Sequence, residues 1–338
     1  MNRAKAVLFI LVISITNSFA QGSLKKSSGS NINPFRRFIG NITVSGSIGY
    51  GATFNSHEIT SGGIIQNPNS APLIFDNTFA VTDSISIAYT NWIGNPSVIR
   101  NTPIDTTSFL LGTDSIAVKY KALGTNIPIN VSVHYVFDRY RIGGGFAFEP
   151  YFVGEYRPGV FKGELESFKA DFKLSYYLRW YFMLGGEVFK TQRNMIVVDA
   201  KVGTYNQQKK HFNPDVIKKG IFFNLGVRFE HSLSEYVKVY LRPSVEFKNY
   251  TITIPESTYN ITHNLPAFYT NIGVTWRLPD RNKCPISSCH TQINHHHGRK
   301  NYRSRVHPFW KWQDPDYGQN YPRLVKYKGK NKRKINPY

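Results

Sequence analysis

The chain has 338 residues, a formal net charge of +21 and only two cysteines. This length allows one substantial domain with appendages, and two cysteines exclude a disulfide-rich scaffold. After the first 20 residues no apolar run is long enough for a transmembrane helix, which needs about 20 apolar residues. A membrane protein with this sequence would therefore be a closed β-barrel, the other architecture that satisfies its backbone hydrogen bonds in lipid.

Residues 1–20 predict a secretory signal peptide. A basic start and a short apolar stretch lead to Ser18 and Ala20, the small residues that a signal peptidase reads. The apolar stretch is about half as long as a spanning helix, which argues against a membrane anchor. We therefore predict export and cleavage before Gln21, followed by a flexible basic lead-in over residues 21–40.

The segment from Tyr236 to Leu278 carries the clearest strand pattern. Over Tyr236–Asn249, apolar side chains alternate strictly with polar or charged ones, and the alternation returns from Phe268 to Leu278. Strands of this length with one apolar face are typical of membrane-spanning sheets. Six earlier segments alternate in the same way: residues 42–53, 127–137, 141–155, 168–180, 182–202 and 220–231, with a turn expected near Tyr181.

The predicted connections alternate in length. Those after the second, fourth and sixth strands are short, whereas the others are longer, and residues 55–113 form the longest. Short inner turns and long outer loops are typical of bacterial outer-membrane barrels. The fold class is therefore all-β: an eight-stranded antiparallel transmembrane β-barrel over residues 41–279. The even strand number predicts that the N- and C-termini both lie in the periplasm.

This architecture resembles the eight-stranded OmpA-like outer-membrane β-barrels over about residues 40–280. The resemblance rests on strand pattern and connection length, since no motif in this region is specific to one family. It implies a location in the outer membrane, with lipid against the outer face. It implies no chemistry.

Inward-facing residues of the predicted barrel carry charges of both signs. Because an unpaired buried charge is costly, we expect ion pairs that fill the lumen; the alternative is a path for protons or ions. The predicted inward charges are Glu149, Asp171, Lys173, Arg179, Glu187, Arg228, Glu230, Lys238, Arg242 and Glu246.

Residues 280–338 predict a basic, irregular periplasmic tail. From Arg281 onward the chain has 14 Lys and Arg residues but only two acids, Asp314 and Asp316. Aromatic residues are interleaved with the charges, unlike the composition of a disordered spacer. We predict a partner-binding surface at Phe309, Trp310, Trp312, Tyr317 and Tyr321.

The tail also contains both cysteines and a group of histidines. Cys284 and Cys289 precede His290, His295 and His297, and thiolates with imidazoles are zinc ligands. However, the histidines lack the usual spacing of a second ligand pair. An oxidising periplasm favours a Cys284–Cys289 disulfide. Zinc and free thiols are the alternatives, and no other cofactor is expected.

One catalytic alternative lies at the outer rim. Ser56, His57 and Glu58 follow the first strand, His263 precedes the eighth, and barrel closure makes these strands neighbours. A nucleophile and a base could meet there as in a hydrolase. No G-x-S-x-G signature supports this site, so we predict no catalytic residues.

The sequence thus predicts a non-enzymatic outer-membrane subunit that anchors or organises an envelope assembly, such as secretion or motility machinery, through its tail. Expected partners are outer-membrane lipid and a periplasmic or outer-membrane protein, or peptidoglycan. Export argues against nucleic acid, despite the basic residues. The main alternative is a surface barrel whose long outer loop binds a ligand or another cell.

Overall fold

The computed structural model describes residues 34–311, except 60–61, 77–79, 82–83, 113–117, 258–259 and 299. The predicted signal peptide and the last part of the tail lie outside the described residues. The described regular structure is antiparallel β apart from one helix, α2 (Pro34–Gly40). The end of the predicted flexible lead-in is therefore helical. In this part of the chain, no helix is both long and apolar enough to cross a membrane.

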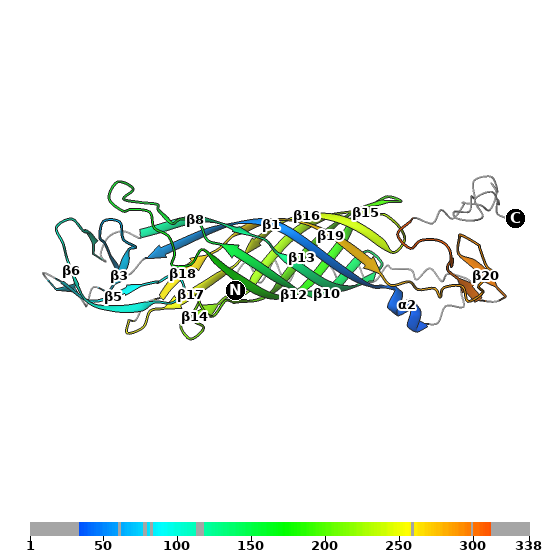
Figure 1. The fold of residues 1–338 in the computed structure, drawn as a ribbon, viewed down its shortest axis with the longest axis horizontal. Helices are drawn as coiled ribbons and strands as arrows, with labels where there is room; N and C mark the ends of the chain where they lie inside the picture. The colour runs from blue at the N-terminus through cyan, green and yellow to red at the C-terminus, as the bar shows by residue number, and fades with distance from the viewer. Residues whose placement is uncertain are drawn as a thin grey trace, which may run out of the picture.

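Eight antiparallel strands close into a ring (Figure 1). β1 pairs with β9 on one side and with β19 on the other, so this part of the sheet has no free edge. The predicted all-β class and the number of strands are confirmed. In order around the ring, the strands are β1 (Ile42–Ile59), β9 (Ile129–Phe137), β10 (Tyr140–Phe152), β12 (Leu174–Lys190), β13 (Asn194–Gln207), β15 (Phe222–Ser232), β16 (Val237–Phe247) and β19 (Ala267–Arg277).

Short connections lie at one end of the ring and long ones at the other. The short-connection end holds residues 138–139, 191–193 and 233–236, and the chain enters and leaves the ring there, because Thr43 pairs with Arg277. The first and last strands of the ring thus begin and end at the same end of it, as the even strand number requires. The segments at the long-connection end are 60–128, 153–173, 208–221 and 248–266.

The predicted boundary between the fourth and fifth strands is wrong. β12 runs without interruption through Tyr181 to Lys190. Tyr181 and Met183 continue the buried face of this strand, while Phe182 and Leu184 continue its exposed face, so the alternation keeps its phase across the expected turn. The chain reverses instead at residues 191–193.

The predicted outer loop, residues 55–113, is largely folded instead of irregular. β1 continues to Ile59, and six strands that are mostly too short to show a clear period form a second antiparallel sheet (Figure 1). Those strands are β2 (Gly63–Gln66), β3 (Leu73–Phe75), β4 (Ala80–Val81), β5 (Ser84–Thr90), β6 (Ser97–Pro103) and β7 (Phe109–Leu111).

We call this second sheet, together with residues 56–59 and the described residues at the long-connection end, the cap. Its remaining strands extend the wall of the ring, and both sets pack around one apolar cluster that includes Tyr89, Trp92, Tyr120, Phe168 and Ile252. The cap therefore has a conventional core. The remaining strands are β8 (Val118–Asn126), β11 (Arg157–Pro158), β14 (Ile217–Lys219), β17 (Asn249–Thr253) and β18 (Asn260–Asn264).

The ring has the opposite polarity to the cap. Its outward side chains are apolar and its inward side chains are mainly polar, charged or Tyr. Ile272, for example, is 63% exposed although it lies in the middle of β19. Exposed apolar residues occur on all eight strands: Ile48, Tyr50, Val131, Val133, Ile142, Phe148, Trp180, Phe182, Leu184, Val198, Val202, Phe223, Leu225, Phe229, Leu241, Val245, Phe268, Ile272, Val274 and Trp276.

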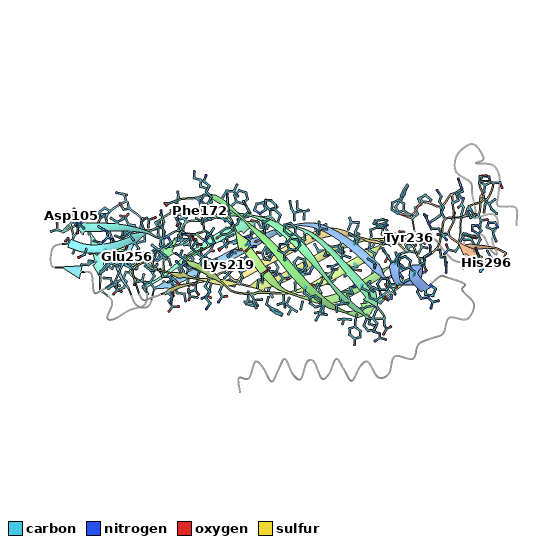
Figure 2. All side chains as sticks on the ribbon, turned by 90° about the horizontal axis from the view of Figure 1, so that it is seen from below. Asp105, Phe172, Lys219, Tyr236, Glu256 and His296 are labelled. Atoms are coloured by element: carbon cyan, nitrogen blue, oxygen red, sulfur yellow. The ribbon has the colours of Figure 1, made fainter. Side chains whose placement is uncertain are left out.

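The described part of the tail lies beyond the short-connection end, on the same side as α2 (Figure 1). In Figure 2, His296 of the tail lies at the opposite end of the molecule from Asp105 and Glu256 of the cap. Two short strands form an antiparallel hairpin in the tail, β20 (His295–His297) and β21 (Lys300–Tyr302). The prediction of an irregular tail is therefore wrong for this part, which contains a small folded unit.

Candidate functional site

The ring interior contains a buried group of ion pairs next to the cap. Arg179 of β12 pairs with Glu149 of β10 and, at 2.6 Å, with Glu246 of β16. The Nζ atom of Lys248 lies 3.2 Å from Glu246 and 3.5 Å from Glu149. The Tyr269 hydroxyl donates a 2.7 Å hydrogen bond to Glu149. Four strands are therefore joined across the lumen by one charge cluster.

A second group of ion pairs lies nearer the short-connection end. The Arg242 Nε atom donates a 2.8 Å hydrogen bond to Asp199, which is 3.5 Å from Arg228. Arg228 also lies 3.7 Å from Glu230. The amide of Asn224 connects the two groups, because it accepts from Arg242 at 2.8 Å and donates to Glu246 at 3.2 Å. A continuous polar network thus runs along the interior.

The predicted inward charges are mostly correct. Six of the ten are buried in the interior, and Lys238 pairs with Glu230 at 3.3 Å. The prediction is wrong for Asp171 and Lys173, which are exposed because they precede β12. Glu187 is half-buried and pairs with Lys190. The buried charges absent from the predicted set are Arg141, Asp199, Lys201 and Lys248.

The network leaves little free volume. The cavity lined by Arg179, Lys201 and Arg242 measures about 10 Å³, which is close to the lower limit for one water molecule. A larger cavity of about 290 Å³ lies toward the short-connection end, with His134 and Lys238 among its lining residues. The described interior around Arg179 and Arg242 is therefore filled by side chains, and the larger free volume lies toward the short-connection end.

The two histidines of the predicted outer-rim site do meet. His57 and His263 are fully buried in the cap, with ring centroids 4.3 Å apart and their Nδ1 atoms in hydrogen-bond contact. Ser56 and Glu58, however, face the other side of β1, as alternate residues of a strand must. Glu58 instead lies 3.6 Å from Lys119 on the surface. No serine–histidine pair is formed.

Aromatic rings surround this histidine pair. His263 stacks on Tyr250 with centroids 4.4 Å apart, and His57 contacts Tyr156 and Trp92. Burial lowers the pKa of His57 to about 3, and burial beside His57 lowers the pKa of His263 well below its usual value. Imidazoles this weakly basic are poor general bases at neutral pH. The pair therefore belongs to the core of the cap, and these residues do not form the serine–histidine geometry of the hydrolase alternative.

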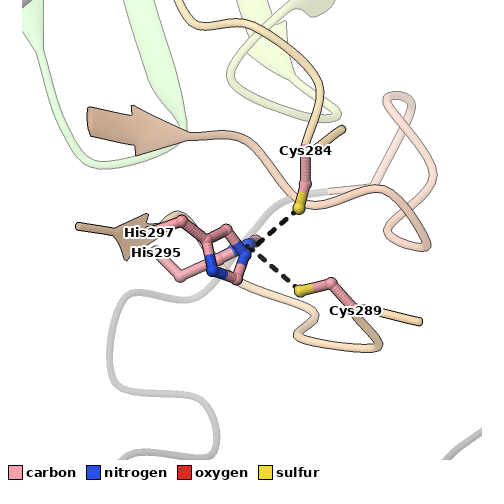
Figure 3. A group of neighbouring side chains, drawn as sticks. All are labelled: Cys284, Cys289, His295 and His297. Atoms are coloured by element: carbon pink, nitrogen blue, oxygen red, sulfur yellow. Dashed lines mark hydrogen bonds between the residues drawn. The ribbon is translucent and has the colours of Figure 1, made fainter. Parts of the chain in front are cut away.

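Four side chains of the tail converge on one point (Figure 3). The sulfur of Cys284 lies 3.2 Å from Nε2 of His297, and the sulfur of Cys289 lies 3.2 Å from Nε2 of His295. The two Nε2 atoms are 3.0 Å apart. All four atoms lie within 4.8 Å of one another, so they could surround a single metal ion.

The backbone of the tail explains why these four residues meet. Alternate residues of a strand point to the same side, so His295 and His297 of β20 share one face whereas His296 does not. Cys284 is held beside the end of the hairpin, because its N–H donates a 3.1 Å hydrogen bond to the carbonyl of Arg303. His290, which the sequence also suggested as a ligand, is exposed and lies outside the cluster.

Both cysteines are free thiols in the structure, Cys284 buried and Cys289 half-buried. The predicted disulfide is therefore not formed here, and each sulfur contacts an imidazole instead. The predicted aromatic surface is described only in part. Phe309 and Trp310 are 46% and 57% exposed and contact each other at 5.2 Å between ring centroids. Its other members, Trp312, Tyr317 and Tyr321, lie outside the described residues.

No family model matches the chain, and no curated protein matches it either. Two solved structures overlap much of it. The outer membrane protease OmpT from Escherichia coli is 12% identical, covers 70% of this chain and 97% of its own, and has a TM-score of 0.32. A Pseudomonas aeruginosa FadL homologue is 8% identical, covers 72% and 91% respectively, and has a TM-score of 0.20. Both likenesses are too low to carry an argument about this chain, and the resemblance to OmpA-like barrels stays a prediction.

Proposed function

We propose that the ring is an eight-stranded transmembrane β-barrel in a bacterial outer membrane and that the protein is a non-enzymatic subunit, which anchors or organises an envelope assembly through its tail. The observation that carries the membrane location is the apolar exterior, which occurs on all eight strands. Water-soluble proteins rarely expose an apolar patch larger than a few hundred Å². Lipid is the solvent that suits such a surface.

The filled interior supports an anchoring role over a transport role. An ion or solute crossing the ring would have to disrupt pairs such as Arg179–Glu246 and Lys248–Glu149, which are buried on both partners. Leaving either partner unpaired in the interior would cost several kcal/mol, roughly 3–5 per broken pair. The contacts that define the function therefore lie at the ends of the ring.

Helix α2 supports an arrangement in which the short-connection end meets the periplasmic membrane surface. Phe35 and Phe38 of this helix are exposed, and Arg36 and Arg37 lie between them in the sequence. Phe38 also contacts Tyr135 of β9 at 5.2 Å between ring centroids. Aromatic and basic side chains at the edge of an apolar band suit the lipid headgroup region. Together with the predicted signal peptide, this supports the proposal that the tail lies in the periplasm.

The tail offers the contacts of an interaction surface. Its excess of Lys and Arg attracts acidic partners, such as an acidic protein surface or peptidoglycan, but salt screens this attraction beyond about 8 Å. The exposed pair Phe309 and Trp310 supplies apolar area of the kind that dominates binding energy at protein interfaces. We therefore assign partner selection to the aromatic residues and faster encounter to the charges.

The test is isolation of partners from gently solubilised envelopes. A Phe309→Ala, Trp310→Ala double variant should recover its partners in amounts reduced by about tenfold or more. Leu110→Ala, an equally exposed apolar residue in the cap at 44%, is the matched control and should recover them in full. Heat-modifiable gel mobility verifies that each variant has a folded barrel. Equal recovery with both variants, and with residues 280–338 deleted, would contradict a role for the tail.

A second function is favoured by one observation in the cap. A pocket of about 150 Å³ lies between residues 91–95 and 168–172, with Trp92 and Phe172 among its walls and Lys210 at its rim. A cap that binds a ligand at the cell surface would use this pocket. Phe172→Ala, a half-buried wall residue, should then reduce attachment to the ligand or cell while leaving recovery of envelope partners unchanged.

A further inference from the structure

We propose that Cys284, Cys289, His295 and His297 bind one Zn²⁺ ion and that this ion holds the folded part of the tail together. The site goes beyond the anchoring function, because it would exist whether or not the tail binds a partner. It follows from the positions of four ligand atoms, from the strand that presents two of them, and from the absence of an apolar core around them.

The ligand atoms already lie close to the separations that zinc requires. Tetrahedral zinc with bonds of about 2.3 Å to sulfur and about 2.0–2.1 Å to nitrogen places its ligand atoms about 3.3–3.8 Å apart. The two sulfur–nitrogen contacts are 3.2 Å, the nitrogen–nitrogen contact is 3.0 Å, and no pair exceeds 4.8 Å. Shifts of a few tenths of an ångström in the first three, and somewhat more in the longest, complete the tetrahedron.

A second contact fixes the orientation of the His295 imidazole. Nδ1 of His295 lies 2.9 Å from the carbonyl oxygen of Ile293. That carbonyl can only accept, so Nδ1 carries the proton and Nε2 presents its lone pair to the centre of the cluster. Hydrogen bonding of the outer nitrogen in this way is typical of metal-bound histidines.

The described part of the tail has no apolar core that could hold these residues in place. Among its described residues, 279–298 and 300–311, only Cys284 and Ser304 are buried. The larger apolar side chains Ile286, Val306 and Trp310 are exposed. A unit this small normally needs a disulfide or a metal ion to be stable. In this tail the buried centre consists of the cysteines and histidines themselves.

The ligand set selects zinc and a structural role. Two thiols and two imidazoles without a carboxylate do not suit Ca²⁺ or Mg²⁺, which prefer oxygen ligands. On binding, both thiols lose their protons to solvent, and two thiolates balance the charge of the Zn²⁺ ion. Four protein ligands complete the tetrahedron and leave no position for water or substrate, as in structural zinc sites.

The disulfide remains the chemical rival, and thiol protection separates the two. In the zinc-bound protein, a chelator should make both cysteines reactive toward N-ethylmaleimide, whereas a non-chelating reductant alone should not. A disulfide would show the reverse pattern, and free thiols would react at once. Either of these last two results, in full-length protein freshly extracted into detergent, would overturn the proposal.

Metal analysis of the same protein provides the second test. The chain should be purified through a tag other than polyhistidine and should contain about one zinc per chain by mass spectrometry. Cys289→Ser and His297→Ala should each lower the zinc content by at least tenfold. His290→Ala and His296→Ala, which change neighbouring imidazoles outside the cluster, should retain it. Equal zinc loss in all four variants, or in none, would contradict this ligand set, and barrel mobility on gels excludes general misfolding.

Discussion

The ring and the cap are both built of antiparallel strands, and β1 runs through both, but they place their apolar side chains on opposite sides. In the ring, apolar residues such as Leu241 face outward, and charged residues such as Arg179 are buried inside. In the cap, Trp92 and Tyr120 are buried in an apolar cluster, whereas charged residues such as Arg100 are exposed. The reversal occurs along single strands, because β1 contributes Ile48 to the apolar exterior of the ring and Ile59 to the core of the cap.

This difference shows that the two regions are stabilised by different surroundings. Burial of apolar area from water stabilises the cap, as in any soluble domain. The apolar area of the ring lies on its outside, so in the proposed membrane location lipid supplies that contribution, and the interior depends on charge pairing. The same substitution should consequently have different effects in the two regions.

The largest difference is expected for the loss of an ion-paired arginine. Arg179→Met leaves Glu149 and Glu246 buried with Lys248 as their remaining cation, and should lower the free energy of unfolding by about 3–5 kcal/mol. Arg100→Met breaks the exposed cap pair with Glu256, at 3.2 Å, and should cost no more than about 1 kcal/mol. Urea unfolding of detergent-refolded protein measures both.

A second substitution repairs part of this loss if the mechanism is correct. Arg179→Met leaves two carboxylates for one cation, Lys248; Glu246→Gln in that background leaves Glu149 alone with Lys248 and should restore part of the stability. If the double variant is no more stable than Arg179→Met alone, unpaired charge is not the cause of the loss.

The next largest difference concerns an exterior leucine. Leu241 in the ring and Leu110 in the cap are 43% and 44% exposed. Leu241→Arg should destabilise the protein by about 2–4 kcal/mol if this residue lies near the bilayer midplane. Leu110 faces water, so Leu110→Arg should change the free energy of unfolding by about 0.5 kcal/mol or less. Similar effects of both changes on unfolding in lipid vesicles would show that the ring exterior does not face lipid.

The smallest expected effect is a pH dependence confined to the cap. The pKa of His57 is lowered to about 3 in the folded protein, below the usual 6.5, so the unfolded chain binds more protons between these values. Stability should therefore fall as the pH decreases below 6.5, by about 1 kcal/mol between pH 6.5 and pH 5.5 for one such imidazole. His263, whose pKa is also lowered, should add to the effect.

Hydrogen exchange of the cap at the two pH values measures this dependence. For the double variant His57→Gln, His263→Gln, the change in stability with pH is compared with that of the unmodified protein, since the absolute stability of the variant will also differ. An unchanged slope in the variant would assign the pH dependence to other groups.

The sequence predicted the ring well because each of its strands carries two chemically distinct faces. The alternation around Val245 and Glu246 needs only the local sequence, and the same phase placed Arg179 and Arg228 inside correctly. It could not predict which charges pair, because Arg242 meets Asp199 through the register between different strands. The cap was missed since strands as short as Leu73–Phe75 contain too few residues to show a period.

The candidate metal site was predicted as a set of residues but not as a geometry. The sequence spacing of His295 and His297 differs from that of a usual second pair of zinc ligands, but the strand places both side chains on one face. The hairpin with β21 is too short to show a period in the sequence, and the hydrogen bond from Cys284 to Arg303 joins residues 19 apart, so neither could be read from the local pattern. The alternation of the histidines was the available signal and agrees with the omission of His296 from the predicted ligands, whereas only the structure excludes His290.

The central proposal is that the ring crosses the outer membrane, with the cap outside the cell and the tail in the periplasm. Epitope tags test it directly when one is inserted in the exposed turn at residues 105–107 of the cap and another follows Tyr338. On intact cells, antibody should label the cap tag alone, and the C-terminal tag should become accessible only after the outer membrane is permeabilised. Labelling of both tags on intact cells, or of the C-terminal tag alone, would contradict this arrangement.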